Sequence, residues 1–216
     1  TIGFDYKSDG LYVDSEGGLC NMPHYYRLSQ ERLAKAQRDL SRKIDANISG
    51  YRIDGNKRYP IYQKPLSECK NIQKARIKVA RIQAHIANQR KDFLHKESAA
   101  ITKLYDFVCV EDIDMKVMAN HGFGNGKATL DNGYGMFRNM LSYKLAKKGG
   151  SLVKVSKFFP SSQLCCECGS RYHFLKDLSI RKWECPHCHA QHDRDVNAAV
   201  NIKTEGLRML LSATSV

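Results

Sequence analysis

Two pairs of cysteines near the C-terminal end constrain this chain more than any other feature. Cys165 and Cys168 form one C-x-x-C, Cys185 and Cys188 form another, and 16 residues separate the two pairs. This spacing is typical of a zinc ribbon, in which two tight turns each present two thiolates to a tetrahedral ion. Because about thirty residues cannot bury a core of their own, the metal must supply the folding free energy. The sequence therefore predicts a structural Zn²⁺ site at these four cysteines.

Other uses of the thiols stay open at this point. The two pairs are also compatible with disulfides in a secreted protein, but the chain is highly charged and its first residues form no basic and apolar leader, which favours a reducing cytoplasm. His187 or His189 could replace one thiolate, and Cys166 could compete with its neighbour. No window reaches the roughly 18 uncharged apolar residues that a membrane span needs. We therefore expect a cytoplasmic protein with no membrane partner.

The distribution of charge indicates a polyanionic partner. Lys and Arg number 35 against 22 Asp and Glu, which gives a formal net charge of +13. Residues 27–100 hold 18 of the basic residues and seven of the acidic ones. Such an excess favours nucleic acid, although solubility alone also explains a charged helical surface. We expect this region to bind a nucleic-acid backbone.

Hydrophobic periodicity predicts strands first, and then strands that alternate with helices. Strands are expected at residues 1–6, 11–14, 105–111 and 151–156, the third of them buried and parallel to its neighbours. Helices are expected over 134–148 and from Asp195 to about Met209. Two more helices between residues 27 and 100, with apolar residues three and four apart, should pair as a basic antiparallel hairpin. The expected fold is α/β with a mixed sheet.

Two segments are predicted to be loops. Residues 47–66 contain Gly50, Gly55, Pro60 and Pro65, which interrupt regular structure. Residues 112–135 are rich in glycine. The GFGNG within this second segment lacks the spacing of a dinucleotide-binding turn, so we expect no such site.

Three acidic residues stand where a sheet-based nuclease needs them. Asp5 is on the first predicted strand, Glu111 ends the buried strand, and Asp195 opens the last helix. Two Mg²⁺ ions about 4 Å apart are a common solution for phosphodiester hydrolysis, and Mg²⁺ prefers oxygen ligands. Since the ends of neighbouring strands lie together, residues far apart in sequence can share such a site. The sequence thus offers these three carboxylates as Mg²⁺ ligands.

Each acid also has an ordinary explanation. Asp5 could face solvent or start a turn, and Asp112 or Asp114 is as good a candidate as Glu111. Asp193 is a plausible N-cap of the last helix, which leaves Asp195 in the first turn, where an acid is favourable in any case.

Several stretches of the chain resemble one known family. Trp183-x-Cys185-Pro186-x-Cys188 and the following HDRDVNAAVNI, from His192 to Ile202, resemble the C-terminal signature of TnpB, the transposon-associated OrfB family. Glu111-Asp112, KATLDNGYGMF, Phe159-Pro160-Ser161-Ser162 and NQRKDFLHK resemble the same family in the same order. The resemblance spans essentially all 216 residues.

The resemblance implies an RNase H-like RuvC nuclease with an inserted basic helical hairpin and an inserted zinc ribbon. It implies a core over 1–160 with the hairpin at about 27–100, a ribbon over 161–191, and a final motif and helix over 192–216. Asp5, Glu111 and Asp195 become the catalytic acids that hold two Mg²⁺ ions, with Asp193 as the alternative third acid. The four cysteines become the zinc ligands. Arg194 could orient a carboxylate or contact a phosphate.

The implied activity is RNA-guided cleavage of DNA in a prokaryotic cytoplasm, with DNA as the substrate and a guide RNA bound by the full-length protein. The chain departs from the family at Tyr6-Lys7, where a glycine often follows the first acid. The family's proteins also have an upstream half, which is expected to grip the guide RNA. The alternatives are therefore an inactive nucleic-acid-binding remnant and a transposase that joins DNA strands.

Overall fold

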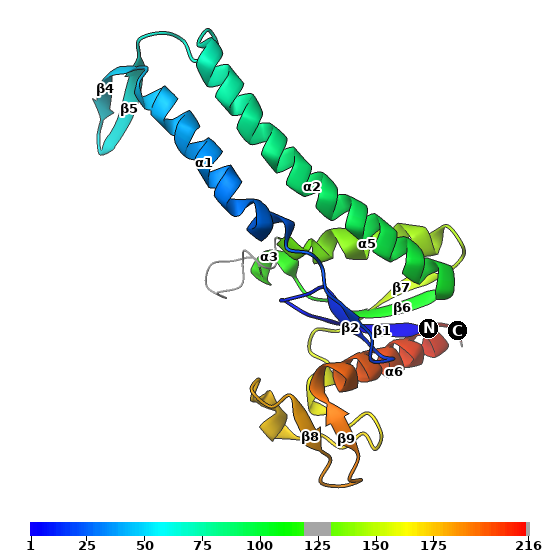
Figure 1. Cartoon of the computed structure of the whole chain (residues 1–216). Helices are drawn as coiled ribbons and strands as arrows, with labels where there is room; N and C mark the ends of the chain where they lie inside the picture. Colours follow the sequence, from blue (N-terminus) through cyan, green and yellow to red (C-terminus); the bar gives the residue numbers. More distant parts are fainter. Residues whose placement is uncertain (119–130, 215–216) are drawn as a thin grey trace. The chain divides into compact units, whose positions relative to one another are not determined.

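The computed structural model describes residues 1–118 and 131–214 (Figure 1). The chain divides into two compact units, one made of Thr1–Pro23 with Asp92–Val216 and the other of His24–Lys91. The first unit contains the large sheet, the three candidate catalytic acids and the two cysteine pairs. The second is made of helices and a strand pair.

The first unit is built on a mixed five-stranded sheet in the order β3-β2-β1-β6-β7. Its strands are β1 (Ile2–Tyr6), β2 (Tyr12–Asp14), β3 (Leu19–Cys20), β6 (Phe107–Glu111) and β7 (Ser151–Val155). The first three strands form an antiparallel meander, while β6 runs parallel to both β1 and β7. The predicted mixed sheet and the predicted parallel central strand are confirmed.

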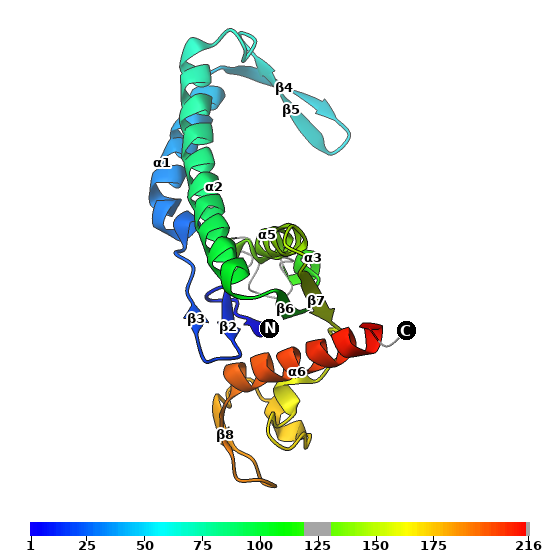
Figure 2. The same ribbon diagram turned by 90° about the vertical axis from the view of Figure 1, so that its right-hand side faces the viewer.

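Two helices cover opposite faces of this sheet, α5 (Tyr134–Ala146) and α6 (Arg194–Thr214), as Figures 1 and 2 show. Because successive strand residues point to opposite faces, Phe4 and Gly3 meet different helices. The rings of Phe4 and Phe137 of α5 lie 6.3 Å apart. Gly3 faces α6 instead, at a very close approach between strand and helix.

Glycine at position 3 is required by that approach. A Cβ there would lie 2.3 Å from the carbonyl oxygen of Ala199 and 2.7 Å from the backbone nitrogen of Lys203. Gly3→Ala is expected to lower the free energy of unfolding by about 3 kcal/mol, because backbone atoms cannot rotate away from the new methyl group. Urea unfolding measures this loss. Gly50→Ala is the matched control, since its Cβ would meet no atom within 4 Å; equal losses in both variants would contradict the close approach.

The second unit confirms the predicted helical hairpin. The helix α1 (Tyr25–Asp45) packs against the first part of α2 (Lys70–Leu104), whose last residues belong to the first unit. Their shared core is apolar and consists of Leu33, Ala36, Val79, Ile82 and Ile86. These residues step by three and four along each helix, as the sequence indicates.

The prediction of a loop over residues 47–66 is wrong. Most of this segment is an antiparallel strand pair, β4 (Ile48–Asp54) and β5 (Lys57–Tyr62). Gly55 adopts a φ of +56°, which a two-residue hairpin turn requires, so the glycine makes the turn that joins the strands. Pro60 is tolerated because both strands of a two-stranded sheet are edges, where a missing N–H need not leave a gap in the ladder.

The remaining elements are short. They are α3 (Met115–Met118), the 3₁₀ turns η2 (Ser161–Gln163) and η3 (His173–Lys176), and the strands β8 (Lys182–Glu184) and β9 (Gln191–Asp193). Of the predicted glycine-rich loop, residues 119–130 lie outside the described residues, including the GFGNG.

Candidate active site

Two of the three predicted acids lie at the C-terminal ends of neighbouring parallel strands, Glu111 as the last residue of β6 and Asp5 as the last but one of β1. The register pairs Gly3 of β1 with Cys109 of β6, and the same register brings Asp5 level with Glu111. Cys109 packs against Ile202 of α6. Since residues two apart share a face, Asp5 and Glu111 both lie on the face that α6 covers.

The third acid stands at the beginning of the helix on that face. Asp193 accepts hydrogen bonds through Oδ1 from the backbone nitrogens of Asp195 and Val196, at 3.0 and 3.2 Å. It is thus the N-cap of α6, as the sequence suggests, and its carboxylate is occupied by the helix end. Asp195 follows in the first turn, where its carboxylate acts on Asp5.

The electrostatics of Asp5 reflect this convergence. Burial raises the pKa of Asp5 most; the carboxylates of Asp195 and Glu111 raise it further, to about 8, against the lowering effect of the Arg194 guanidinium. Burial also raises the pKa of Glu111. Asp5 is therefore the carboxyl group on which the other two acids act.

The three carboxylates interact without forming one tight cluster. In residues 1–118 and 131–214, only the four cysteines bring their ligand atoms close enough together to hold a metal ion. Asp195 forms an ion pair, with Nη1 of Arg181 at 3.2 Å from its Oδ1. The structure therefore brings the other two acids into electrostatic contact with Asp5 without gathering the three sets of carboxylate oxygens into one metal-binding cluster.

Asp112 and Asp114, which were as good candidates as Glu111 from the sequence, contact other groups in the structure. Asp112 lies 3.6 Å from Nη1 of Arg138 and 3.9 Å from Nζ of Lys154. Asp114 accepts a hydrogen bond from the backbone nitrogen of Val117, at 3.4 Å, near the start of α3. The carboxylates that raise the pKa of Asp5 are instead those of Asp195 and Glu111.

Two hollows open beside Glu111. One of about 420 Å³ is lined by Glu111 itself. The other, of about 650 Å³, is lined in part by Arg138, Asn139 and Phe158. Lys157 borders both hollows. No motif in the sequence indicated Lys157 or Arg138, because each is a single basic residue in a basic chain.

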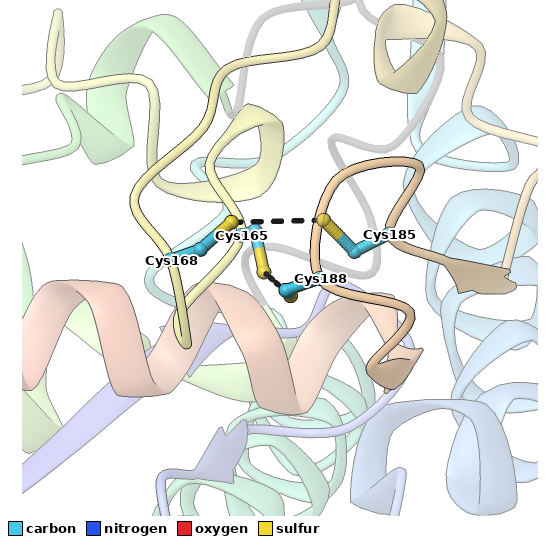
Figure 3. A group of neighbouring side chains, drawn as sticks. All are labelled: Cys165, Cys168, Cys185 and Cys188. Carbon is cyan, nitrogen blue, oxygen red and sulfur yellow. Dashed lines mark hydrogen bonds between the residues drawn. The ribbon is translucent and has the colours of Figure 1, made fainter.

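The four cysteines lie together, as Figure 3 shows. Sγ of Cys165 lies 3.6 Å from Sγ of Cys188, and Sγ of Cys168 lies 3.7 Å from Sγ of Cys185. Disulfide sulfurs would lie about 2 Å apart, whereas thiolates about 2.3 Å from a shared tetrahedral Zn²⁺ lie roughly 3.8 Å apart. The donor set fits a tetrahedral metal ion such as zinc, and all eight cysteines are unbridged.

The thiol of Cys185, one of the four, has a lowered pKa. Burial by itself would raise the pKa of Cys185, but hydrogen bonds from the Tyr172 hydroxyl and from the backbone nitrogens of Cys188 and His187 outweigh it and lower the pKa to about 5. The Tyr172 oxygen lies 3.3 Å from the sulfur. Metal ions bind the thiolate form, so this environment favours binding.

The alternative ligands lie elsewhere. Nδ1 of His189 faces Glu184 at 3.1 Å. Cys166 lies outside the four-cysteine group, and its backbone nitrogen donates to Oδ1 of Asn197 at 2.9 Å. His192 was not among the predicted ligands, yet its Nε2 lies 3.1 Å from Sγ of Cys165.

His192 should support the metal site from outside the ligand set. It is buried and packs on Trp183, with ring centroids 4.5 Å apart. His192→Ala is expected to weaken zinc affinity by about tenfold to a hundredfold, because it removes a hydrogen bond to a ligand sulfur. Competition with a chromogenic chelator measures this affinity. His189→Ala is the matched control; a loss of the same size there would contradict the role of His192.

Polar side chains of α6 tie this metal centre to the sheet unit. Nδ2 of Asn197 donates to the carbonyl oxygen of Leu164 at 2.7 Å, and Nδ2 of Asn201 donates to that of Ser161 at 2.8 Å. Arg194 is buried and donates to the carbonyl oxygen of Asp177. The DRDVNAAVNI motif thus joins the cysteine-rich segment to the helix that carries Asp195.

A family model described as a probable transposase, OrfB of the IS605 type, matches residues 1–121 of the chain. The chain belongs to the OrfB family. A second model, described as the TNB domain of Cas12f1-like proteins, matches residues 134–202 of this OrfB chain. The predicted relationship to TnpB is confirmed.

Two curated relatives have sequences similar to that of the OrfB chain. A Streptomyces pristinaespiralis protein named "Putative RNA-guided DNA endonuclease" is 37% identical over 206 residues, which cover 95% of this chain and 45% of the relative. An Escherichia coli K12 protein named "Putative RNA-guided DNA endonuclease InsQ" is 28% identical over 225 residues, which cover 97% of this chain and 50% of the relative. The OrfB chain therefore spans about half the length of the curated relatives it matches.

A solved structure confirms the fold of the OrfB chain. A protein chain in the cryo-EM structure of the CRISPR-Cas12f ternary complex matches with a TM-score of 0.53 and 17% identity, over 93% of this chain and 38% of that one. The predicted RuvC-type α/β fold is thereby confirmed. Within residues 1–118 and 131–214, every helix is too short or too polar to cross a lipid bilayer.

Proposed function

We propose that the chain is the nuclease portion of an RNA-guided DNA endonuclease, and that it hydrolyses DNA phosphodiesters with Asp5, Glu111 and Asp195. The observation that carries the proposal is the convergence of these acids: two lie at the ends of neighbouring parallel strands, the third lies in the first turn of the helix over them, and the other two acids both raise the pKa of Asp5. Perturbed carboxyl groups of this kind are concentrated at functional sites. The names of the relatives support a nuclease.

Mg²⁺ fits this donor set. Carboxylate oxygens are its preferred ligands, and bound cations would relieve the repulsion by Asp195 and Glu111 that adds to burial in raising the pKa of Asp5. When bound, two Mg²⁺ ions supply an activated water and stabilise the charge that develops on the leaving oxygen. Asp5 must release its proton to serve as a ligand, so metal binding and deprotonation of Asp5 are coupled.

Basic residues around the acids are placed to hold the substrate. The Arg181 side chain, which is paired with Asp195, is 66% exposed. A DNA phosphate can therefore bind Arg181 in place of Asp195, and the Asp195 carboxylate is then available to the metal site. Lys157 borders the hollow of Glu111, and the ring of Phe158 next to it is 83% exposed. A charged group for the phosphate and an open ring for a base suit single-stranded or unwound DNA.

Cleavage of single-stranded DNA tests the function directly. The chain is incubated with a 5′-labelled DNA strand in Mg²⁺ and, separately, in EDTA. Mg²⁺-dependent products with a 3′ hydroxyl and a 5′ phosphate support the proposal. Joined strands would support a transposase instead, and salt-sensitive binding with no product at any Mg²⁺ concentration would support an inactive binding remnant.

Without divalent cations, stability should fall as pH rises. The pKa of Asp5 is about 8 in the folded chain and about 3.9 in an unfolded one, so the folded state keeps a proton that the unfolded state has lost. The resulting stabilisation is complete below about pH 4 and disappears by about pH 8, with a slope of up to about 1.4 kcal/mol per pH unit. Asp5→Asn stays neutral at every pH and should flatten this profile. Urea unfolding in EDTA measures it; identical slopes in both proteins would contradict the raised pKa.

We also propose zinc as the ion of the four-cysteine centre, and a guide RNA as a partner of the full-length protein. Four cysteine sulfurs that lie close enough together to hold one ion, in a short segment with only a small buried cluster of its own, support a structural Zn²⁺. The division into a nuclease core over 1–160, a ribbon over 161–191 and a final motif and helix over 192–216 remains a prediction.

A further inference from the structure

The strand pair formed by β4 and β5, here called the β4–β5 ribbon (Ile48–Tyr62), shares no hydrogen-bonded ladder with the large sheet. It forms a two-stranded sheet of its own. Every residue from 51 to 61 is exposed. Among them are four large hydrophobic side chains, those of Tyr51, Ile53, Tyr59 and Ile61, with exposures of 51%, 70%, 41% and 49%. A two-stranded ribbon is only marginally stable by itself, so apolar side chains held outward on it indicate a contact with a partner.

Each face of the ribbon carries one pair of an arginine with a tyrosine. Arg52 stands directly opposite Tyr59 in the register, and its guanidinium carbon lies 5.6 Å from the centre of that ring. Arg58 lies diagonally across from Tyr51 on the other face, 4.7 Å from its ring centre. Stacking on a ring fixes the plane of a guanidinium and leaves its N–H edges free to donate.

The charge of the ribbon selects a polyanion. Residues 51–64 contain one acidic residue, Asp54, and four basic residues, Arg52, Lys57, Arg58 and Lys64. Held guanidinium groups donate two parallel hydrogen bonds to phosphate or to the O6 and N7 edge of guanine. A nucleic acid therefore fits this surface better than an apolar protein groove does.

The geometry of the ribbon distinguishes among nucleic acids. A single strand needs several exposed rings in succession on one face, whereas each face here has one exposed tyrosine, Tyr51 or Tyr59, and Tyr62 at the end of β5 is half-buried. The major groove of A-form duplexes is too narrow for such an element. The major groove of B-form DNA, about 12 Å wide, admits a two-stranded ribbon, and its two phosphate walls match arginines on two faces.

We propose that the β4–β5 ribbon is a DNA-binding arm that enters the major groove of B-form duplex DNA. Arg52 and Arg58 contact opposite walls or guanine edges, and the two tyrosines hold them in place. This interaction is separate from the hydrolysis proposed above, since it requires neither the three acids nor a catalytic metal ion.

Binding in EDTA tests the proposal independently of cleavage. The affinity of the chain for a fluorescent 20-base-pair mixed-sequence duplex is measured by anisotropy at several salt concentrations. Arg52→Ala with Arg58→Ala should raise Kd about tenfold or more and lower the salt slope by about 2, one unit per lost phosphate contact. The control, Lys103→Ala with Lys147→Ala, removes the same charge from two exposed sites outside the second unit and should change Kd less than threefold, roughly the effect of lost long-range attraction.

Two further measurements separate the groove contact from simple attraction. Tyr51→Leu with Tyr59→Leu should weaken binding, whereas the matched pair Tyr51→Phe with Tyr59→Phe keeps both rings and should bind like the parent. The parent, but not the double arginine variant, should protect guanine N7 from dimethyl sulfate, since N7 lies in the major groove. Unchanged duplex affinity in the arginine variant, absence of N7 protection, or a ribbon-dependent preference for single-stranded DNA or an RNA–DNA hybrid would overturn the proposal. If DNA binding is unchanged, the exposed surface belongs to a protein contact instead.

Discussion

Replacing Asp5 with asparagine should abolish DNA cleavage while leaving the fold intact. Asparagine has the size of aspartate but is a poor ligand for Mg²⁺, and it removes the charge on which both neighbouring acids act. The variant loses several kcal/mol of metal-assisted stabilisation of the transition state, which corresponds to a fall in rate of about 1,000-fold or more. The rate is measured in the single-strand assay with saturating Mg²⁺, and urea unfolding checks that the variant is folded.

Asp193→Asn is the control for this experiment. Asp193 caps α6 through its Oδ1, and asparagine caps a helix about as well as aspartate does. This variant loses an acid two residues from Asp195 and should cut at nearly the parent rate. Normal cleavage by Asp5→Asn, or a loss in Asp193→Asn as large as the one expected for Asp5, would show that the three acids are wrongly assigned.

The second large effect is expected at the metal centre. Cys185→Ser removes the thiol with the lowered pKa, and bound zinc should fall from one ion per chain to nearly none. Structural zinc contributes roughly 10–16 kcal/mol of binding free energy in small domains, so the segment between the cysteine pairs should unfold. Because Asn197 and Asn201 bind that segment to α6, Asp195 should lose its position as well. Zinc content by elemental analysis and cleavage rate should fall together.

Cys166→Ser provides the comparison within the same segment. Cys166 neighbours a ligand in sequence but stands outside the four-cysteine group. Its substitution should leave zinc content unchanged and cleavage close to that of the parent. Full zinc content in Cys185→Ser, or equal zinc loss in both variants, would refute the four-cysteine assignment.

Much of the fold was predictable because its elements carry strong periodic patterns. The compact apolar run that ends in Glu111 is the buried parallel strand β6, and the apolar steps through Val79 and Ile86 form the seam of the helical hairpin. The β4–β5 ribbon was missed because Gly55 and Pro60 read as breaks. In the structure, the first makes a hairpin turn and the second lies on an edge strand. A propensity rule cannot distinguish a residue that ends a strand from one that joins two.

The candidate site was predictable in its residue types but not in its geometry. The sequence offered Asp5, Glu111 and Asp195, and it also offered Asp112 and Asp193. The register of β1 against β6, which aligns Asp5 with Glu111, distinguishes Glu111 from Asp112. The N-cap of α6, which is made by Asp193, distinguishes Asp195 from Asp193. Contacts made by single residues leave no pattern at all, as with Arg181 against Asp195 and His192 against a cysteine sulfur.

The place where the helical unit interrupts the chain has a practical consequence. The chain leaves the sheet unit at Pro23 and returns at Asp92, between β3 and β6, so no strand of the large sheet is made from the interrupting residues. Evolution or an engineer can therefore lengthen, trim or exchange that insert without shifting Asp5 against Glu111. If the two proposals hold, changes in DNA binding and changes in chemistry can accumulate in separate parts of one gene.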